Sequence, residues 1–244
     1  MSGGELIVVA VAVLAASFVQ IIAGFGFALL CMPIMTLAID VKAAVVVSTL
    51  VATVSISWQA WVLRGDAAPN NTARLCIGAF LGMPRGLVVL HGAPEHGLRL
   101  ALGIAVLIAT ALLAMGINLS HAGAPLDIVA GFLSGVLNTS LSTNGPPLVF
   151  ALQARQLDAD QFRGTLVRVF AFSNIVTITM FATTGTVTGQ GLRAAAVALP
   201  AWLVGTLAGW PVRSRISGEP FRRMVLALLC VVGVSAVYFA LTSG

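Results

Sequence analysis

Apolar runs long enough to cross a lipid bilayer follow one another along the chain, and they limit its possible folds more than any other feature. About 20 helical residues span the hydrocarbon core, and a helix satisfies its backbone hydrogen bonds internally. Only 9% of the residues are charged, whereas about a quarter are charged in a soluble domain. The sequence predicts an all-α polytopic membrane protein with about 7–8 transmembrane segments. The expected runs are 5–37, 43–63, 73–91, 97–117, 126–152, 160–184, 192–212 and 221–241.

Several functional classes are disfavoured by what the chain lacks. It has no stretch for a soluble domain and no glycine–lysine phosphate loop, so we expect no nucleotide hydrolysis by this chain alone. Cys31, Cys76 and Cys230 are isolated in apolar sequence, which is typical of packing residues. The N-terminus lacks the basic region of a signal peptide, so the first run is expected to be retained. We expect no cofactor, no metal and no nucleic-acid partner.

The run at 126–152 is interrupted by a polar stretch that ends in Pro146 and Pro147. Broken helices at bilayer depth line cavities and bind substrates in many transporters. The two prolines fit the first turn of a new helix, whose N-terminus would face the break and favour an anion. A polar kink satisfied by neighbouring helices is the alternative. The predicted substrate-binding residues of this stretch are Asn138, Thr139, Ser140, Ser142, Thr143, Asn144 and Gly145.

The run at 5–37 contains a matching break at Gly24-Phe25-Gly26. Gly24 and Gly26 permit a tight turn or a close backbone approach, and Gln20 could face the same cavity. Helix packing alone would also explain these glycines. Because breaks occur at corresponding places in both halves, we add Gln20, Gly24 and Gly26 to the predicted binding residues.

The two halves of the chain show the same plan of one broken helix and three continuous helices. Gly82 and Gly86 of the first half correspond to Gly205 and Gly209 of the second. We therefore expect two transmembrane repeats, 1–122 and 123–244, within a single membrane domain. If each broken segment dips in and returns, the repeats are inverted; if it crosses fully, they are not.

The basic residues orient the chain in the membrane. Full crossing of the broken segments divides them ten to three between the two sides, and re-entry divides them nine to four. In both cases the basic 213–223 loop is expected in the cytoplasm and the C-terminus on the opposite side.

Arginine predominates among the 13 basic residues, since Lys42 is the sole lysine. Guanidinium groups suit carboxylate, sulfonate and phosphate anions. Arg168 lies about two turns inside a predicted helix, so an anion-attracting role competes with a structural one. Arg163, near the helix start, could instead reach the interface. No mid-helix carboxylate is present, so a proton relay of the usual Asp/Glu kind has little support.

Three motifs of this chain resemble those of the TauE/SafE family of anion permeases. They are Ala23-Gly24-Phe25-Gly26, Thr143-Asn144-Gly145-Pro146-Pro147 and Phe162-Arg163-Gly164-Thr165, the last followed by Asn174 and Gly185. The resemblance covers nearly the whole chain. It implies a multi-pass permease of the bacterial inner membrane for sulfite, sulfonates, sulfoacetate or related anions, acting as importer or exporter. The family often has glycine where this chain has Phe27 and Pro146.

We therefore expect a secondary transporter of a small organosulfur anion, with the lipid bilayer as its surroundings. The alternatives are a permease subunit of a multi-component system and a carrier of a non-sulfur organic anion. An enzyme is disfavoured, because every His, Asp and Glu falls at the end of a predicted span or in a loop. Glycines at four-residue spacing favour close packing within the monomer over a homodimer seam, which stays open.

Overall fold

The computed structural model describes residues 1–23, 26–62, 67–115, 123–155, 157, 159–213, 234 and 238. All regular secondary structure in these residues is helical, so the predicted all-α class is confirmed. The run at 221–241 lies outside the described ranges, apart from two single residues. The helices are α1 (Gly3–Ala23), α2 (Phe27–Met35), α3 (Val41–Val62), α4 (Pro69–Gly92), α5 (Glu95–Met115), α6 (Gly123–Leu141), α7 (Gly145–Ala154), α8 (Ala159–Thr183) and α9 (Gly189–Arg213).

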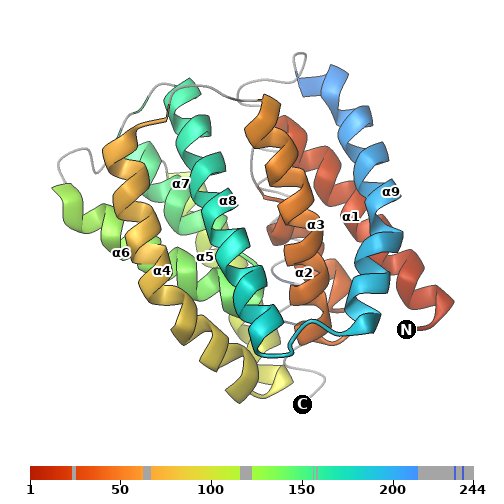
Figure 1. Cartoon of the computed structure of the whole chain (residues 1–244). Helices are drawn as coiled ribbons and strands as arrows, with labels where there is room; N and C mark the ends of the chain where they lie inside the picture. Colours follow the sequence, from red (N-terminus) through yellow and green to blue (C-terminus); the bar gives the residue numbers. More distant parts are fainter. Residues whose placement is uncertain are drawn as a thin grey trace.

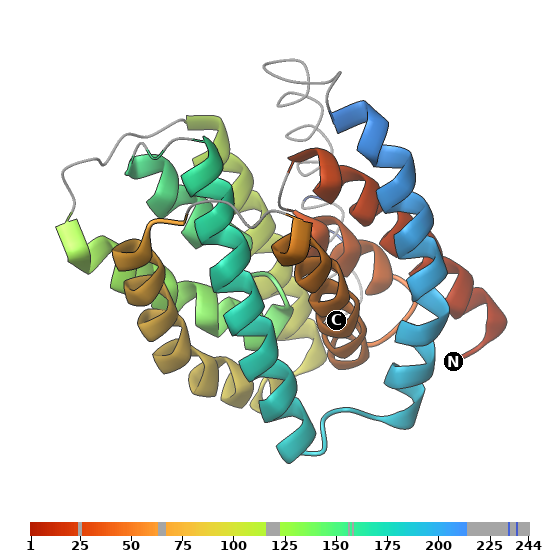
Figure 2. The same cartoon turned by 45° about the horizontal axis from the view of Figure 1, so that its top comes forward.

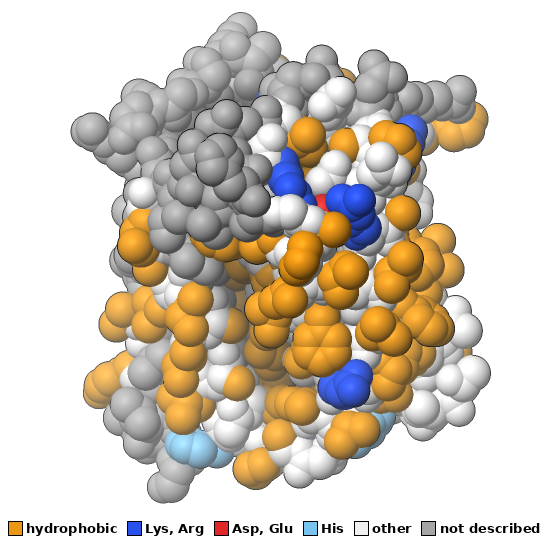
Figure 3. All heavy atoms as spheres, turned by 90° about the vertical axis from the view of Figure 1, so that its left-hand side faces the viewer, with side chains coloured by type: hydrophobic (Ala, Val, Ile, Leu, Met, Phe, Trp, Pro, Cys, Tyr) orange, Lys and Arg blue, Asp and Glu red, His pale blue; other side chains and the backbone are white. Residues whose placement is uncertain are grey.

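Six of the described helices are long and apolar enough to cross a membrane, which confirms a multi-pass membrane protein. Large hydrophobic side chains cover their outer faces, as Figure 3 shows for one side of the molecule. Such an apolar belt suits lipid and would be a liability in water. The candidate spans are Gly3–Ile22, Val41–Trp61, Pro69–Gly92, Gly123–Leu141, Gln161–Thr183 and Gly189–Val212.

Each of the two long predicted runs consists of a membrane-length helix followed by a short one. α2 has 9 residues and α7 has 10, so each rises only about 14–15 Å, roughly half of the hydrocarbon core. The second break is shorter than expected, because α6 continues through Leu141 and α7 begins at Gly145. The expectation that the break begins at Asn138 is therefore wrong about its extent. Pro146 and Pro147 do occupy the first turn of α7, as predicted.

The α6–α7 pair turns back on itself. Arg155 directly follows α7, and its guanidinium donates to the carbonyl of Gly123, the first residue of α6. The same side chain pairs with Asp127 in the second turn of α6. Both ends of this pair therefore lie together, which is the geometry of a re-entrant hairpin.

The α1–α2 pair also turns back, but from the other end of the molecule. Met1 and Glu5 line the same surface cavity as Asp40, which follows α2, and as His91, near the end of α4. In contrast, the α6–α7 pair contacts Arg74, near the start of α4. Because α4 is 24 residues long, the two hairpins enter from opposite ends.

Two helix seams hold the hairpins in the bundle (Figures 1 and 2). α4 packs along α6, and α1 packs along α9. A methyl group added at Gly82 would collide with the Phe132 carbonyl across the first seam, and one at Gly205 with the Leu14 carbonyl across the second. The predicted role of these spaced glycines in packing within the monomer is confirmed at these seams.

Candidate functional site

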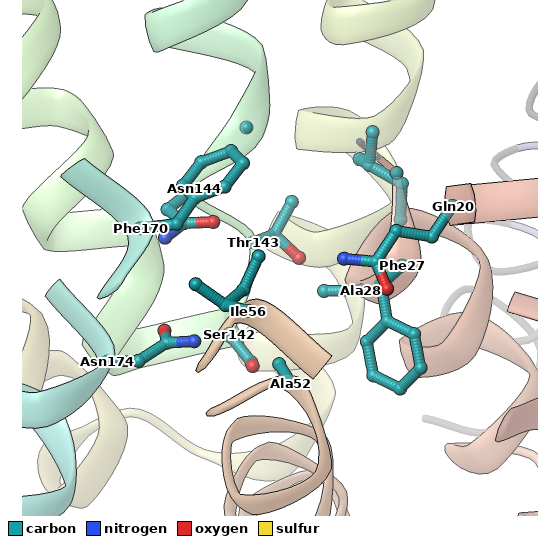
Figure 4. Close-up of a pocket in the computed structure, with 13 residues that line it drawn as sticks. Gln20, Phe27, Ala28, Ala52, Ile56, Ser142, Thr143, Asn144, Phe170 and Asn174 are labelled. Carbon is teal, nitrogen blue, oxygen red and sulfur yellow. The ribbon is translucent and has the colours of Figure 1, made fainter. Parts of the chain in front are cut away.

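The two helix breaks meet at one small cavity of about 30 Å³ (Figure 4). The α1–α2 break forms one side and the α6–α7 break another, while α3 and α8 complete the wall. No charged side chain is among the described lining residues. They are Gln20, Gly26, Phe27, Ala28, Leu29, Ala52, Ile56, Ser142, Thr143, Asn144, Gly145, Phe170 and Asn174.

Ser142 forms the sharp turn of the second break. Its φ of 55° is unusual for a residue other than glycine. Its N–H donates to the Asn138 carbonyl at 2.9 Å, which is how a left-handed residue caps the C-terminus of a helix. Its Oγ lies 3.1 Å from both Ser48 Oγ and Thr49 Oγ1 of α3. The turn is therefore fixed by backbone and side-chain bonds together.

The N-termini of α2 and α7 both border the cavity. Gly26, the N-cap of α2, has a φ of 95° and no side chain to cap the N–H groups of the first turn. Phe27, Ala28 and Leu29 line the cavity, and their N–H groups precede the first intrahelical bond, which Leu30 makes. This helix end carries a partial positive charge that favours an anion.

The N-terminus of α7 offers fewer main-chain donors. Gly145 has an N–H group, but Pro146 and Pro147 have none. The side chains of Thr143 and Asn144 supply polar groups here instead (Figure 4). The main-chain carbonyl of Asn144 accepts a hydrogen bond from Ser134 Oγ at 2.9 Å.

Two buried amides face the cavity from opposite sides. Gln20 of α1 and Asn174 of α8 are each only 4% exposed, and their nitrogens point inward (Figure 4). Ser55 Oγ donates to Gln20 Oε1 at 2.8 Å, which leaves the nitrogen of this amide for the cavity. Neither nitrogen has a hydrogen-bond partner in the described part of the chain.

The remaining wall is apolar, from Phe27, Leu29, Ala52, Ile56 and Phe170. Hydrogen bonds are electrostatically stronger in such low-dielectric surroundings. The volume suits roughly two water molecules. The arrangement can therefore hold a small anion by neutral donors, without a fixed countercharge.

Half of the predicted binding residues come together here. Of the others, Gly24 lies outside the described residues, and three are buried in α6 behind the wall. Asn138 Nδ2 donates to Thr177 Oγ1 at 2.8 Å, Thr139 Oγ1 to the Met83 carbonyl at 2.8 Å, and Ser140 Oγ to the Val136 carbonyl at 2.7 Å. The predicted residues that line the cavity are Gln20, Gly26, Ser142, Thr143, Asn144 and Gly145.

Arg163 and Arg168 do not line this cavity; both are exposed on α8. Their role in attracting an anion stays a prediction.

Sequence reasoning missed the lining residues from α3 and α8 as binding residues. Ala52, Ile56 and Phe170 look like ordinary residues of apolar helices, and no pattern distinguishes them. Asn174 did carry a usable signal, because an amide inside an apolar run is costly unless it faces protein or water.

A buried ion cluster lies at the start of α6. Asp127 is fully buried and accepts from Arg155 Nε at 3.1 Å and from Asn71 Nδ2 at 3.1 Å. Arg155 Nη2 lies 2.9 Å from Asp127 Oδ2, and Arg74 Nη1 lies 3.7 Å from it. The cluster therefore anchors the returning end of the α6–α7 hairpin to α4.

Comparison with known proteins agrees with this picture. A family described as "Sulfite exporter TauE/SafE" matches residues 8–236. A protein of Cupriavidus necator named "Probable sulfite/organosulfonate exporter TauE" is 23% identical over 240 residues, which cover 94% of this chain and 92% of the relative. No solved structure matches the chain.

Proposed function

Because the chain belongs to the TauE/SafE sulfite exporter family and is a multi-pass inner-membrane protein, we propose that it transports sulfite or a small organosulfonate. The coarser function, an anion transporter, follows from the family. The choice of a sulfur oxyanion rests on the names of the family and of the Cupriavidus relative, both of which describe exporters.

The observation that supports this proposal most is the neutral, donor-lined cavity between the two breaks. The Gln20 amide and the N–H groups at the start of α2 lie on the side of the α1–α2 break, and the Asn174 amide lies on the opposite side. A sulfite or sulfonate group has three oxygens, so it can accept from all three groups of donors. A site without a fixed cation binds more weakly, and a transporter needs to release what it binds.

A carboxylate carrier and a permease subunit of a larger system remain the alternatives. A carboxylate presents its acceptor lone pairs in a single plane, whereas the three oxygens of a sulfite or sulfonate group project in three directions. Burying an unpaired donor is unfavourable, so this geometry favours the three-oxygen anion.

The proposal includes the two halves, 1–122 and 123–244, as inverted repeats around this cavity. The interval from Phe27 to Gly145, the first residues of α2 and α7, equals the interval from Val41 to Ala159, the first residues of α3 and α8. The hairpins also enter from opposite ends, as inverted repeats require.

The test is transport by the purified chain in liposomes, with sulfite, sulfoacetate, a short alkylsulfonate and acetate as substrates. We expect Asn174→Asp to lower the rate of sulfite transport at least about tenfold, because a carboxylate in the cavity repels an anion. Asn70→Asp is the matched control, since Asn70 is exposed at the start of α4. Transport of acetate alone would refute the substrate, and an unaffected Asn174→Asp variant would refute the site.

A further inference from the structure

A buried polar triad extends from the cavity along α3. Gln20 lines the cavity, Ser55 Oγ donates to its Oε1 at 2.8 Å, and Gln59 Nε2 donates to Ser55 Oγ at 3.2 Å. None of the three is more than 4% exposed. Gln59 lies one turn beyond Ile56 of the cavity wall, in the direction of the C-terminal end of α3. This triad therefore leads away from the cavity toward one end of the bundle.

A second triad extends along α8. Asn138 Nδ2 donates to Thr177 Oγ1 at 2.8 Å, and Thr177 lies one turn beyond the cavity residue Asn174. Ser173 Oγ is fully buried and has no hydrogen-bond partner in the described residues. An orphaned buried hydroxyl is rare in proteins and calls for a partner such as water.

The two triads occupy equivalent positions in the two halves. The interval from Gln20 to Asn138 equals those from Ser55 to Ser173 and from Gln59 to Thr177. The same interval also relates the cavity residues Ala52 and Ile56 of α3 to Phe170 and Asn174 of α8.

α3 and α8 run in opposite directions, so the triads leave the cavity toward opposite ends. α3 begins beside Lys42 at the large surface cavity, whereas α8 ends beside Thr184 at that same cavity. Relative to the cavity, Gln59 therefore lies nearer the end of the molecule that holds Arg155, and Thr177 lies nearer the end that holds Lys42. The surface cavity there, about 630 Å³, lies at the outer end of the second triad.

Helix packing alone does not explain the second triad, because it leaves the buried Ser173 hydroxyl without a partner in the described residues. Elsewhere in the molecule, hydroxyls such as those of Ser17 and Thr53 bond to the carbonyl four residues earlier in their own helix. Ser55 and Asn138 instead bond across helices, and Ser173 Oγ bonds to nothing described. Buried polar groups that continue from a polar cavity and include an unsatisfied hydroxyl suit a route for water and small ions.

We propose that the two triads line the two half-paths by which an anion and its water reach the central cavity. The Gln20–Ser55–Gln59 triad serves the end of the molecule that holds Arg155. The Asn138–Ser173–Thr177 triad serves the end that holds Lys42. The inference rests on the proposed transport function and assigns the access route on each side.

The test is sided thiol labelling of the full chain in sealed liposomes of known orientation. The three native cysteines are replaced by alanine, and Gln59→Cys and Thr177→Cys are introduced separately. The probe is a membrane-impermeant methanethiosulfonate reagent that carries a sulfonate group. We expect Gln59→Cys to react from the Arg155 side and Thr177→Cys from the Lys42 side, each at least about tenfold faster than the controls.

The controls are Val51→Cys and Val169→Cys, which are related by the same interval and are both fully buried on α3 and α8. If Gln59→Cys and Thr177→Cys react no faster than the controls, or if both react from the same side, the half-paths are overturned. If a cysteine variant does not fold, Gln59→Leu or Thr177→Val provides the second readout. Each should lower the initial transport rate at least about fivefold, and an unchanged rate would overturn the inference.

Labelling is read as a mass shift and needs no transported substrate. Sided labelling therefore supports the half-paths even if the chain does not transport sulfite, in which case the proposed substrate alone fails.

Discussion

At the scale of single residues, Ser142 shows how the second break is maintained. A residue other than glycine with positive φ costs about 1–3 kcal/mol of backbone strain. The hydroxyl contacts with Ser48 and Thr49 offset part of this cost, and glycine could not make them. The turn thus accepts backbone strain and in return gains side-chain contacts that connect the end of α6 to α3.

Replacement of Ser142 by glycine and by alanine separates these two effects. Both variants lose the hydroxyl, but only alanine keeps a Cβ in the left-handed conformation. We expect Ser142→Ala to unfold more easily in detergent than Ser142→Gly, by about 1 kcal/mol. Equal stability of the two variants, measured by denaturant unfolding, would show that the turn is not strained.

The cavity residues also show what sequence reasoning can and cannot find. The polar stretch before Pro146 identified the right segment, because breaks in apolar runs are visible in composition. It did not show that Asn138, Thr139 and Ser140 stay helical and bond to their surroundings, since backbone conformation decides where a side chain points. The plainer break at Gly26 contributes more main-chain donors, because prolines remove those of α7.

At the scale of helices, the seams depend on backbone contact. Gly82 faces the Phe132 carbonyl so closely that a methyl group does not fit. Gly97, in α5, is different, because the nearest atom to an added Cβ would be Pro94 Cγ at 3.5 Å.

We therefore expect opposite effects of alanine at these two glycines. Gly82→Ala should destabilise the protein by about 1–3 kcal/mol through overpacking of the α4–α6 seam. Gly97→Ala should be neutral or stabilise by up to about 1 kcal/mol, since alanine favours helix. Thermal unfolding in one detergent compares them, and a stable Gly82→Ala variant would contradict the close seam.

The Asp127 cluster gives the α6–α7 hairpin its own test. Removing one partner of a buried ion pair leaves an uncompensated charge, at a cost of about 3–5 kcal/mol. We expect Asp127→Asn to be strongly destabilised. The double variant Asp127→Asn with Arg155→Gln should lose much less free energy of unfolding than the sum of the losses in the two single variants. Additive losses in denaturant unfolding would mean that the pair is not coupled.

At the scale of the whole molecule, the hairpin geometry selects between the two topologies left open by the sequence. Both pairs return to the end where they start, so the re-entrant arrangement applies to both broken segments. Charge counting could not make this choice, because both divisions favour the same cytoplasmic side. Contacts between residues far apart in sequence, such as Arg155 with Gly123, decided it.

Orientation follows from this arrangement. The end with Arg74, Arg155 and Arg163 should face the cytoplasm, and the N-terminus should lie on the opposite side with Lys42. A reporter active only in the cytoplasm should be silent at the N-terminus and active when inserted between residues 155 and 159. The reverse pattern would show that the molecule is inserted the other way round.

The absence of charged side chains around the described cavity determines how voltage acts on transport. When the site is empty, the lining carries no net charge across the membrane; when it is filled, the moving charge is that of the anion alone. A potential of 100 mV, negative inside, then drives each negative charge outward with about 2.3 kcal/mol, or nearly fiftyfold at equilibrium. If the chain transports an anion as proposed, we expect the potential itself to drive the anion outward, whereas uptake through the same cavity would work against the electric field.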